Sequence, residues 1–539
     1  MSKLFSRNAL VAIALAFPIA ALAQPTINAV VNNYSYIPTG FPNSGIAPGT
    51  IFLIYGTAMS SAPAQVALSS SAGSGIPKTL EGATLSVTSG GITVQPAMYY
   101  ATPNQIAAVL PSGTPTGSAT ITVTYNNVTS NAFSFQVVPF ALGINTYFGS
   151  GTGLVLATDN ITGEKITYTN SAKPGETIVL YGSGLGADTA DSDTVYTVTP
   201  HAVNTPLQIY IGGIAATVLY AGSSGYPGYD QIDITIPDNV PLSCYVGLVG
   251  VTGSGSSLTV SNFGSLPVSQ SGGDCNDSVF GITGTTISSL TGQGTVTYGD
   301  VFVAQLVQPA IPPQTGTVTN NIAFASFSKE TGASFGTSSG SVYSIGSCYV
   351  TQVISFSGSI PTFTGLDAGT VSLTGPAGSY TLSSFLKGEY EAELPSGAIT
   401  SSGGAFTYNG AGGADVGSFK TTINLPNPLL NWTNQSAAAT INRSQGVQVN
   451  WTGGGAGTYV IIGGNSSDST TGANGTFTCL ANQSAGTFTV PGYVTSTLPA
   501  GTGGLTVENA ASYSTFTATN LDFGIGFGFT GVTVNSVYQ

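Results

Sequence analysis

Charged side chains are scarce in this sequence. They make up 6% of its 539 residues, whereas an average soluble protein has about 25%. Nine residues are lysine or arginine and 22 are aspartate or glutamate, so the formal net charge is −13. A nucleic-acid binder needs a basic surface to neutralise phosphates, and this composition excludes that class. The hydrophobic share of 41% also excludes a disordered acidic chain, which would be poor in hydrophobic residues.

The residues that many enzymes use for catalysis are few as well. His201 is the only histidine in the sequence, and it follows Pro200 in a stretch that we expect to connect two strands. No Gly-x-Ser-x-Gly motif adjoins it, which argues against a Ser-His-Asp triad. No Cys-x-x-Cys spacing occurs either, which argues against a zinc site. We therefore predict a non-enzymatic protein with no catalytic residue, no metal and no cofactor.

Residues 1–23 have the pattern of a secretory signal peptide. Lys3 and Arg7 give a basic start without acidic residues, an apolar stretch from 10 to 20 follows, and Ala21-Leu22-Ala23 is the small-x-small end of a cleavage site. The apolar stretch is shorter than the ~20 residues that cross a bilayer. We predict that this segment is cleaved and that the protein is secreted or held at the cell surface.

Export changes the meaning of the four cysteines. In an oxidising compartment an even number of cysteines indicates disulfide bonds, and four thiols allow three pairings. Cys244 and Cys275 are close in sequence, whereas Cys348 and Cys479 both lie in the second half. We expect each of these two pairs to form a disulfide.

The hydrophobic pattern predicts β-strands throughout the chain. Apolar and polar residues alternate in segments such as 119–124 and 447–452, and clusters of Gly, Pro, Asn, Ser and Thr interrupt them. Helical spacing is almost absent after residue 23. Short strands with frequent turn signals are typical of β-sandwiches. The predicted fold class is therefore all-β, with uncharged polar residues on the outer faces.

Two segments carry the same landmarks in the same order. Residues 47–59 read APGTIFLIYGTAM and residues 173–185 read KPGETIVLYGSGL, and the sequences Gln105-Ile106 and Gln231-Ile232 follow at corresponding places. Pro-Gly turns the chain into a buried strand, Tyr-Gly ends that strand, and Gln-Ile begins a later one. Repeated landmarks predict tandem domains of one fold, which we place at residues 24–138 and 139–276.

Residues 27–268 resemble an uncharacterised duplicated domain found near the C-termini of many secreted acidobacterial proteins, whose copies are similar to the immunoglobulin-like IPT/TIG fold. The two segments above carry the resemblance, together with YYATPNQIAAVLP, IGGIAATVLYAG and YDQIDITIP. Cys244 and Cys275 also fit that family's pattern. Ala107 departs from it, because the family usually has asparagine there. The resemblance implies tandem immunoglobulin-like β-sandwiches and export, and it implies no catalytic residue.

The second half, residues 277–539, does not repeat these landmarks. We predict a further β-rich region tied by a disulfide between Cys348 and Cys479, with a division near residue 361. The surroundings of these cysteines, Gly-Ser-Cys348 and Phe477-Thr478-Cys479, resemble exported proteins of the same bacterial group that have no assigned function. Residues 523–529 read FGIGFGF, which predicts a strand that seals the last sandwich; the alternative is an exposed strand that docks onto a neighbouring sheet.

Two acidic segments are candidate sites. Glu389, Glu391 and Glu393 are spaced by two, so they share one face of a strand. Paired carboxylates could serve a glycosidase or bind a cation, but an outward, solvated face that prevents edge pairing is the leading interpretation. The loop with Asp188, Asp191 and Asp193 is the densest in acids. It lacks the spacing of an EF-hand, and a hydrated loop is favoured over weak calcium binding.

The two tryptophans are candidates for stacking on a sugar ring. Trp451 shares a face with Val447 and Val449, which points it into a core. Trp432 follows two leucines with less pattern, so it is the better candidate of the two for an exposed side chain that contacts a ligand.

The leading hypothesis is a secreted or cell-surface structural or adhesive protein. It would bind an extracellular protein or polysaccharide, or a second copy of itself, through loops or an edge strand. A carbohydrate-binding or carbohydrate-active protein is the alternative, with Trp432 and the strand from Glu389 to Glu393 as its first residues. A surface array protein stiffened by calcium is the second alternative.

Overall fold

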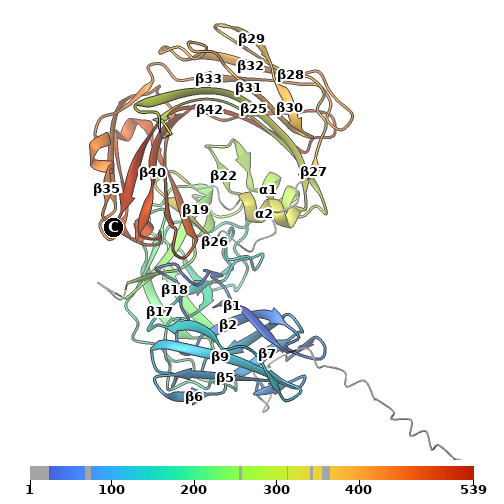
Figure 1. Ribbon diagram of the computed structural model, residues 1–539, viewed down its shortest axis with the longest axis vertical. Coiled ribbons are helices and arrows are strands. Elements are labelled where there is room, and N and C mark those ends of the chain that lie inside the picture. Colours follow the sequence, from blue (N-terminus) through green and yellow to red (C-terminus); the bar gives the residue numbers. More distant parts are fainter. Residues whose placement is uncertain (1–23, 67–74, 254–257, 312, 340–343, 355–363) are drawn as a thin grey trace, which may run out of the picture.

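The computed structural model describes residues 24–66, 75–253, 258–311, 313–339, 344–354 and 364–539 (Figure 1). The predicted signal peptide, residues 1–23, lies outside this part. The described chain is all-β, as its alternating pattern predicted, and the sheets follow one another along the long axis of the molecule. Its helical elements are short: α1 (Gly284–Thr291), α2 (Gly332–Ser339), α3 (Gly492–Thr495) and the 3-10 turns η2 (Gln435–Ala438) and η3 (Gln483–Ala485).

The first sandwich consists of two antiparallel sheets around one core. Phe52 and Ile54 from one sheet meet Leu85 and Ile121 from the other, and all four are buried. The first sheet has the order β1 (Thr26–Asn32), β2 (Ile51–Thr57), β8 (Gln105–Val109), β7 (Ala97–Ala101), β3 (Ala64–Gln65). The second has the order β10 (Val128–Thr129), β9 (Gly117–Tyr125), β5 (Ala83–Ser89), β4 (Thr79–Leu80), with β11 (Phe133–Val137) on β9 and β6 (Ile92–Val94) on β5.

The second sandwich repeats this topology. Its core again joins two antiparallel sheets, with Leu180 and Ile232 facing Ile209 and Leu248. One sheet has the order β12 (Gly143–Ile144), β14 (Thr177–Ser183), β18 (Asp230–Thr235), β17 (Thr217–Ser223), with β13 (Ala157–Asp159) on β14. The other has the order β16 (Ile214–Ala215), β15 (Leu207–Ile211), β19 (Ser243–Thr252), β20 (Thr259–Val260), with β21 (Gly264–Val268) on β19. Both units are immunoglobulin-like β-sandwiches.

The register shows that the two sandwiches are copies of one unit. Tyr55 lies opposite Gln105 in the first, and Tyr181 lies opposite Gln231 in the second. The strand beside each glutamine also carries a bulge at the same place, between Met98 and Tyr100 in β7 and between Val218 and Tyr220 in β17. The shared landmarks of the sequence therefore correspond to shared hydrogen-bonded positions.

Asn32, at the end of β1, joins the two copies. Its side chain is 3% exposed, and its amide nitrogen donates to the carbonyl oxygens of Ala141 and Ser183, both at 2.9 Å. Its amide oxygen accepts from the backbone N–H groups of Tyr34 at 2.8 Å and Ser35 at 3.2 Å. All four hydrogen bonds of the buried amide are satisfied, so the side chain fixes one copy against the other.

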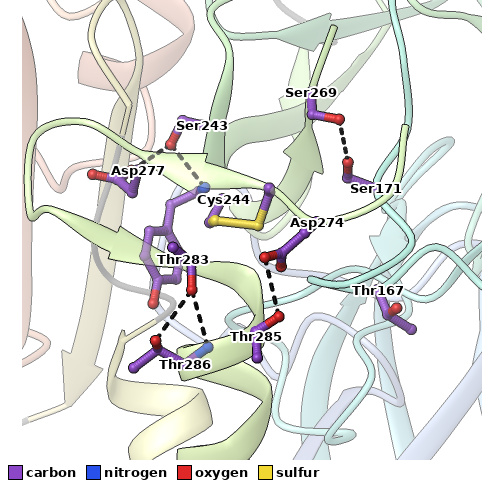
Figure 2. The surroundings of a disulfide bond; sticks show 12 residues. Thr167, Ser171, Ser243, Cys244, Ser269, Asp274, Asp277, Thr283, Thr285 and Thr286 are labelled. Atoms are coloured by element: carbon purple, nitrogen blue, oxygen red, sulfur yellow. Dashed lines mark hydrogen bonds between the residues drawn. A yellow bond between two sulfur atoms is a disulfide. The ribbon is translucent and has the colours of Figure 1, made fainter. Parts of the chain in front are cut away.

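A short β-ribbon and a disulfide lead from the second copy into the C-terminal region. Cys244 on β19 is bonded to Cys275, which directly precedes the ribbon of β22 (Asn276–Asp277) and β23 (Ile282–Thr283). Figure 2 shows this disulfide together with Thr283, whose side chain caps the N-terminus of α1.

The C-terminal region is organised by one twelve-stranded sheet, which curves as an arch in Figure 1. Cys348 and Cys479 lie opposite each other on two of its strands and form the second disulfide. The main path is β26 (Cys348–Ile354), β38 (Ala473–Asn482), β37 (Tyr459–Asp468), β40 (Gly501–Ala510), β42 (Phe523–Tyr538), β24 (Val296–Pro309), β25 (Thr317–Glu330), β31 (Glu389–Glu393), β30 (Ser383–Leu386). Three short strands join it: β27 (Thr364–Gly365) on β25, and β35 (Thr440–Ile441) and β41 (Ser514–Phe516) on β42.

Two smaller sheets cover this large sheet. Val301 and Val303 of β24 share a core with Phe406 and Ile423 of the four-stranded sheet, which lies on the outer side of the arch. That sheet has the order β29 (Gly378–Thr381), β28 (Val371–Gly375), β32 (Gly404–Gly410), β33 (Phe419–Leu425). The three-stranded sheet has the order β34 (Leu430–Trp432), β36 (Val447–Gly453), β39 (Thr487–Val490).

The predicted division near residue 361 falls outside the described residues. Strands on both sides of it nevertheless pair in the twelve-stranded sheet, β25 with β31 and β26 with β38, so hydrogen bonding does not divide the region there.

The FGIGFGF segment is a strand, but it neither seals an edge nor offers one. It begins β42, which lies inside the sheet with β24 parallel on one side. On the other side, the short antiparallel strand β41 pairs with residues 524–526, and β40 pairs with β42 from Phe529 onward. A Cβ on Gly528 would lie 2.8 Å from side-chain atoms of Ile423 and Leu425. Glycine is thus used where the covering sheet approaches β42 closely.

The glycine of the Tyr-Gly landmark allows a similar close approach within the first copy. A Cβ at Gly56 would lie 1.9 Å from the carbonyl oxygen of Thr26 on the neighbouring strand. We expect Gly56→Ala to lower the free energy of unfolding by about 1–3 kcal/mol, the usual cost of overpacking. Urea denaturation measures this, with Gly113→Ala as the control because a Cβ there has no heavy atom within 4 Å. Equal stability of the two variants would contradict the prediction.

Candidate functional site

Both predicted disulfides are present in the structure. Near the Cys244–Cys275 bond, Asp277 is fully buried and accepts hydrogen bonds from the Ser243 hydroxyl at 2.5 Å and from the N–H groups of Val279 and Phe280 at 3.0 and 2.9 Å. Burial raises the pKa of the Asp277 carboxyl, and these donors oppose the shift. Figure 2 shows Asp277 beside Ser243 at the entry to the C-terminal region. The arrangement holds the chain in place and has no exposed reactive group.

The choice of Trp432 as a candidate ligand contact is wrong, because the side chain is buried. Its side chain is 3% exposed and lies directly across from Trp451, also 3% exposed, in the core between the three-stranded and twelve-stranded sheets. Its indole N–H donates to the side-chain oxygen of Asn434 at 2.9 Å. Two sheets bury this tryptophan, and the short leucine run before it does not predict that burial. Trp432 therefore offers no surface to a sugar, whereas the prediction that Trp451 lies in a core is confirmed.

The three glutamates of β31 share one face of the strand, as their spacing predicted. Tyr390 points to the opposite side and is buried, whereas Glu391 and Glu393 are exposed. Glu389 is half-buried and accepts a hydrogen bond from the Ser326 hydroxyl at 2.9 Å.

The acidic loop lies between the two copies. Asp193 accepts hydrogen bonds from the backbone N–H of Ser112, at 3.0 and 3.1 Å, and from its hydroxyl at 2.8 Å. Asp188, Asp191 and Asp193 line a small cavity of about 20 Å³ together with Asp230. Among the residues that the structure describes, no group of three His, Cys, Asp or Glu side chains could hold a metal ion. The loop thus acts as a contact between the copies.

His201 lies at an isolated bridge between Ala202 and Gly222. Its carbonyl oxygen accepts hydrogen bonds from the backbone N–H of Ser223 and from the Tyr220 hydroxyl, both at 2.9 Å. These contacts fix the backbone of His201 within the second copy.

A pocket of about 380 Å³ lies where the first copy meets the second. Five tyrosines line it: Tyr34, Tyr99 and Tyr100 from the first copy and Tyr226 and Tyr229 from the second. The side chains of Asn33 and Gln65 supply polar groups, and Ile51 and Ala107 form apolar wall. No charged residue is among the residues that line it.

The bulge in β7 and the long turn after β17 build this tyrosine pocket. The bulge places the adjacent Tyr99 and Tyr100 on the outer face of the first sheet, and the turn brings Tyr226 and Tyr229 from the second copy. The Tyr99 hydroxyl donates to the carbonyl oxygen of Pro227 at 2.9 Å, which connects the two walls. The Tyr229 ring lies 5.7 Å from that of Tyr34 and stacks on Tyr181 at 5.6 Å.

Burial raises the pKa of four tyrosines of the pocket, Tyr34, Tyr99, Tyr100 and Tyr229, so these four keep their protons at neutral pH. Burial raises the pKa of Tyr229 to about 12 and that of Tyr99 and Tyr100 well above the ordinary value. The walls are therefore neutral phenols, which present apolar ring faces and hydroxyl groups able to donate and accept hydrogen bonds.

Sequence reasoning missed this pocket. The segments YYATPNQIAAVLP and YDQIDITIP carry the resemblance, but their tyrosines do not by themselves predict a shared site. A signal was available, because tyrosine was concentrated in corresponding segments of both copies. That the two segments come together depends on the angle between the copies, which the sequence does not state.

No protein-family model matches the chain, and no curated protein does. Among solved structures, an I-band fragment of titin aligns at 6% identity over 71% of this chain and 99% of its own length, with a TM-score of 0.11. A Salmonella alpha-2-macroglobulin aligns at 9% identity with a TM-score of 0.15, and this chain covers 40% of its length. At these scores neither likeness assigns a function.

In the described part of the chain, no helix is long and apolar enough to cross a membrane.

Asp230 makes the junction sensitive to pH. Its carboxylate accepts hydrogen bonds from the N–H groups of Gly184 at 2.7 Å and Leu185 at 2.9 Å, yet burial raises its pKa to about 7. The folded state thus favours the protonated acid. The contribution of Asp230 to the free energy of unfolding is therefore fully present below the ordinary aspartate pKa of ~4, and it is lost as pH rises through about 7.

We expect the melting temperature of Asp230→Asn, measured relative to that of the native protein, to be higher at neutral pH than at acidic pH. The reason is that the native carboxyl ionises as pH rises, whereas the amide cannot. Melting curves followed by circular dichroism at about pH 4.5 and 7.5 give the comparison. A difference in melting temperature that does not change with pH would contradict the raised pKa.

Proposed function

We propose that this is an exported, non-enzymatic adhesive protein that binds polysaccharide through the tyrosine pocket between its two immunoglobulin-like copies. The observation that carries the proposal is the neutral, tyrosine-rich wall contributed by both copies. A pocket of about 380 Å³ is within the range of small-ligand sites.

The chemistry of the wall favours a sugar over a charged ligand. Sugar rings have apolar C–H faces that pack on aromatic rings, and their hydroxyls form hydrogen bonds with phenol and amide groups. Tyr100 and Tyr226 supply ring faces, and Asn33 and Gln65 supply amides. A charged ligand would lose hydration in this pocket without gaining an opposite charge.

Export is the other part of the proposal. The basic and apolar pattern of residues 1–23 supports it, as do two disulfides, which persist in oxidising compartments. The resemblance of residues 27–268 to duplicated domains of secreted acidobacterial proteins points the same way. Binding of an extracellular protein is one alternative. Sugar cleavage and a calcium-stiffened array are two more, and the experiment below distinguishes these two from the proposal.

Tyr226→Ala tests the pocket. We expect this variant to bind the polysaccharide that the native protein selects on a glycan array about tenfold more weakly, because it loses one stacking face. Titration calorimetry measures the affinity. Tyr147→Ala is the matched control, since Tyr147 is 45% exposed and does not line the pocket.

Failure of the native protein to bind any glycan, or equal binding by Tyr226→Ala, would overturn the proposal. Release of shortened glycan during the titration would favour the enzymatic alternative, and binding only with added calcium would favour the array protein.

A further inference from the structure

A row of aromatic rings crosses the inner face of the twelve-stranded sheet. Phe527 on β42, Phe302 on β24 and Phe324 on β25 are neighbours, with ring centroids 5.4 and 5.1 Å apart. The row continues to Phe385 on the edge strand β30, 6.4 Å from Phe324. At its other end Tyr513 lies 5.5 Å from Phe527. Rings from separate strands thus form one continuous track.

The same face carries the glutamates of β31. In the sheet register Phe302 lies opposite Phe324, and Phe324 lies opposite Glu391. One step along the strands, Ser326 lies opposite Glu389, and one step the other way Ile322 lies opposite Glu393. Side chains that are directly opposite point to one side of a sheet, so the glutamates share the ring-bearing face, one strand in from the edge strand β30.

Among the described residues, no second sheet covers this face around Phe302 and Phe324, whereas at the Tyr513 end Phe280 packs on the Tyr513 ring at 4.5 Å. The opposite side packs against the four-stranded sheet through residues such as Val301 and Tyr390, which are buried. On the ring-bearing side, Phe302, Phe324 and Phe527 are half-buried, Glu391 and Glu393 are exposed, and Phe385 is 55% exposed. In Figure 1 this side is the concave one, above α1 and α2.

The described basic residues of the C-terminal region lie elsewhere. Lys329 is an odd number of positions from Phe324 on β25 and so points to the other side. Lys387 forms an ion pair with Asp415 at 2.8 Å, Lys420 lies on β33 of the covering sheet, and Arg443 donates to the carbonyl of Leu498 at 2.8 Å. The charges on the ring-bearing face are therefore acidic.

We propose that this face binds an extended, lysine- or arginine-bearing segment of a partner protein. Aromatic rings attract cations through their faces, and carboxylates attract them by charge, so both features select the same ligand. Glu389, Glu391 and Glu393 are spaced by two residues on a strand, which is about 6.6–6.8 Å. An extended peptide repeats its side-chain direction at the same interval. A merely solvated strand would explain the glutamates but not the half-buried rings beside them.

The test uses a labelled peptide in which lysine alternates with serine, and fluorescence anisotropy with the full-length protein. We expect Glu391→Gln/Glu393→Gln to weaken binding about tenfold, because two unpaired carboxylates are removed. Phe385→Leu keeps apolar area but loses the ring face, and we expect a smaller, several-fold loss.

Two controls accompany this measurement. Glu81→Gln/Glu164→Gln removes the same charge from exposed positions in the two sandwiches and is expected to bind as the native protein does. A peptide with its lysines grouped at one end is expected to bind more weakly than the alternating one. No binding by the native protein, equal loss in the two double variants, or equal affinity for the two peptides would overturn the proposal.

Discussion

The satisfied amide of Asn32 is the contact on which the arrangement of the first half depends. A buried side-chain amide without partners costs about 1–3 kcal/mol, so the copies must meet where Ala141 and Ser183 offer carbonyl oxygens. Ser183 adds to this constraint, since its hydroxyl accepts from the N–H of Ile51 at 2.8 Å and donates to the carbonyl of Gly228 at 2.5 Å. The orientation of the two copies that these contacts fix also brings the two walls of the tyrosine pocket together.

Hydroxyl side chains, rather than charged ones, supply the polar groups on exposed strand faces of this molecule. Thr88 pairs with Thr93 at 2.8 Å and Thr407 with Thr422 at 2.9 Å across neighbouring strands. Such cross-strand pairs contribute roughly 0.2–1 kcal/mol and are not screened by salt as ion pairs are. The carboxylates that remain are therefore placed at particular positions, at the junction of the copies and along β31.

Local sequence patterns predict the β-strands and the duplicated sandwiches. They do not predict features that depend on contacts between distant parts of the chain. Tyr55 and Tyr181 could be aligned because each is fixed by a nearby Pro-Gly turn and a partner glutamine in the same sandwich. Trp432 was misjudged because its burial depends on a sheet formed by strands from several parts of the chain. The tyrosine pocket escaped notice for the same reason, as did the ring track, in which Phe302 meets Phe527 only through parallel pairing of distant strands.

That parallel pairing bears on the order in which the polypeptide can fold. β24 and β25 form a hairpin as soon as both have emerged, yet β24 stays unpaired on one side until β42 reaches it. Contacts of such long sequence separation slow folding, and an open strand edge invites pairing with other chains. Until β42 has been made, the free edge of β24 therefore stays open to pairing with other chains, and this half of the protein depends on its last strand to close that edge.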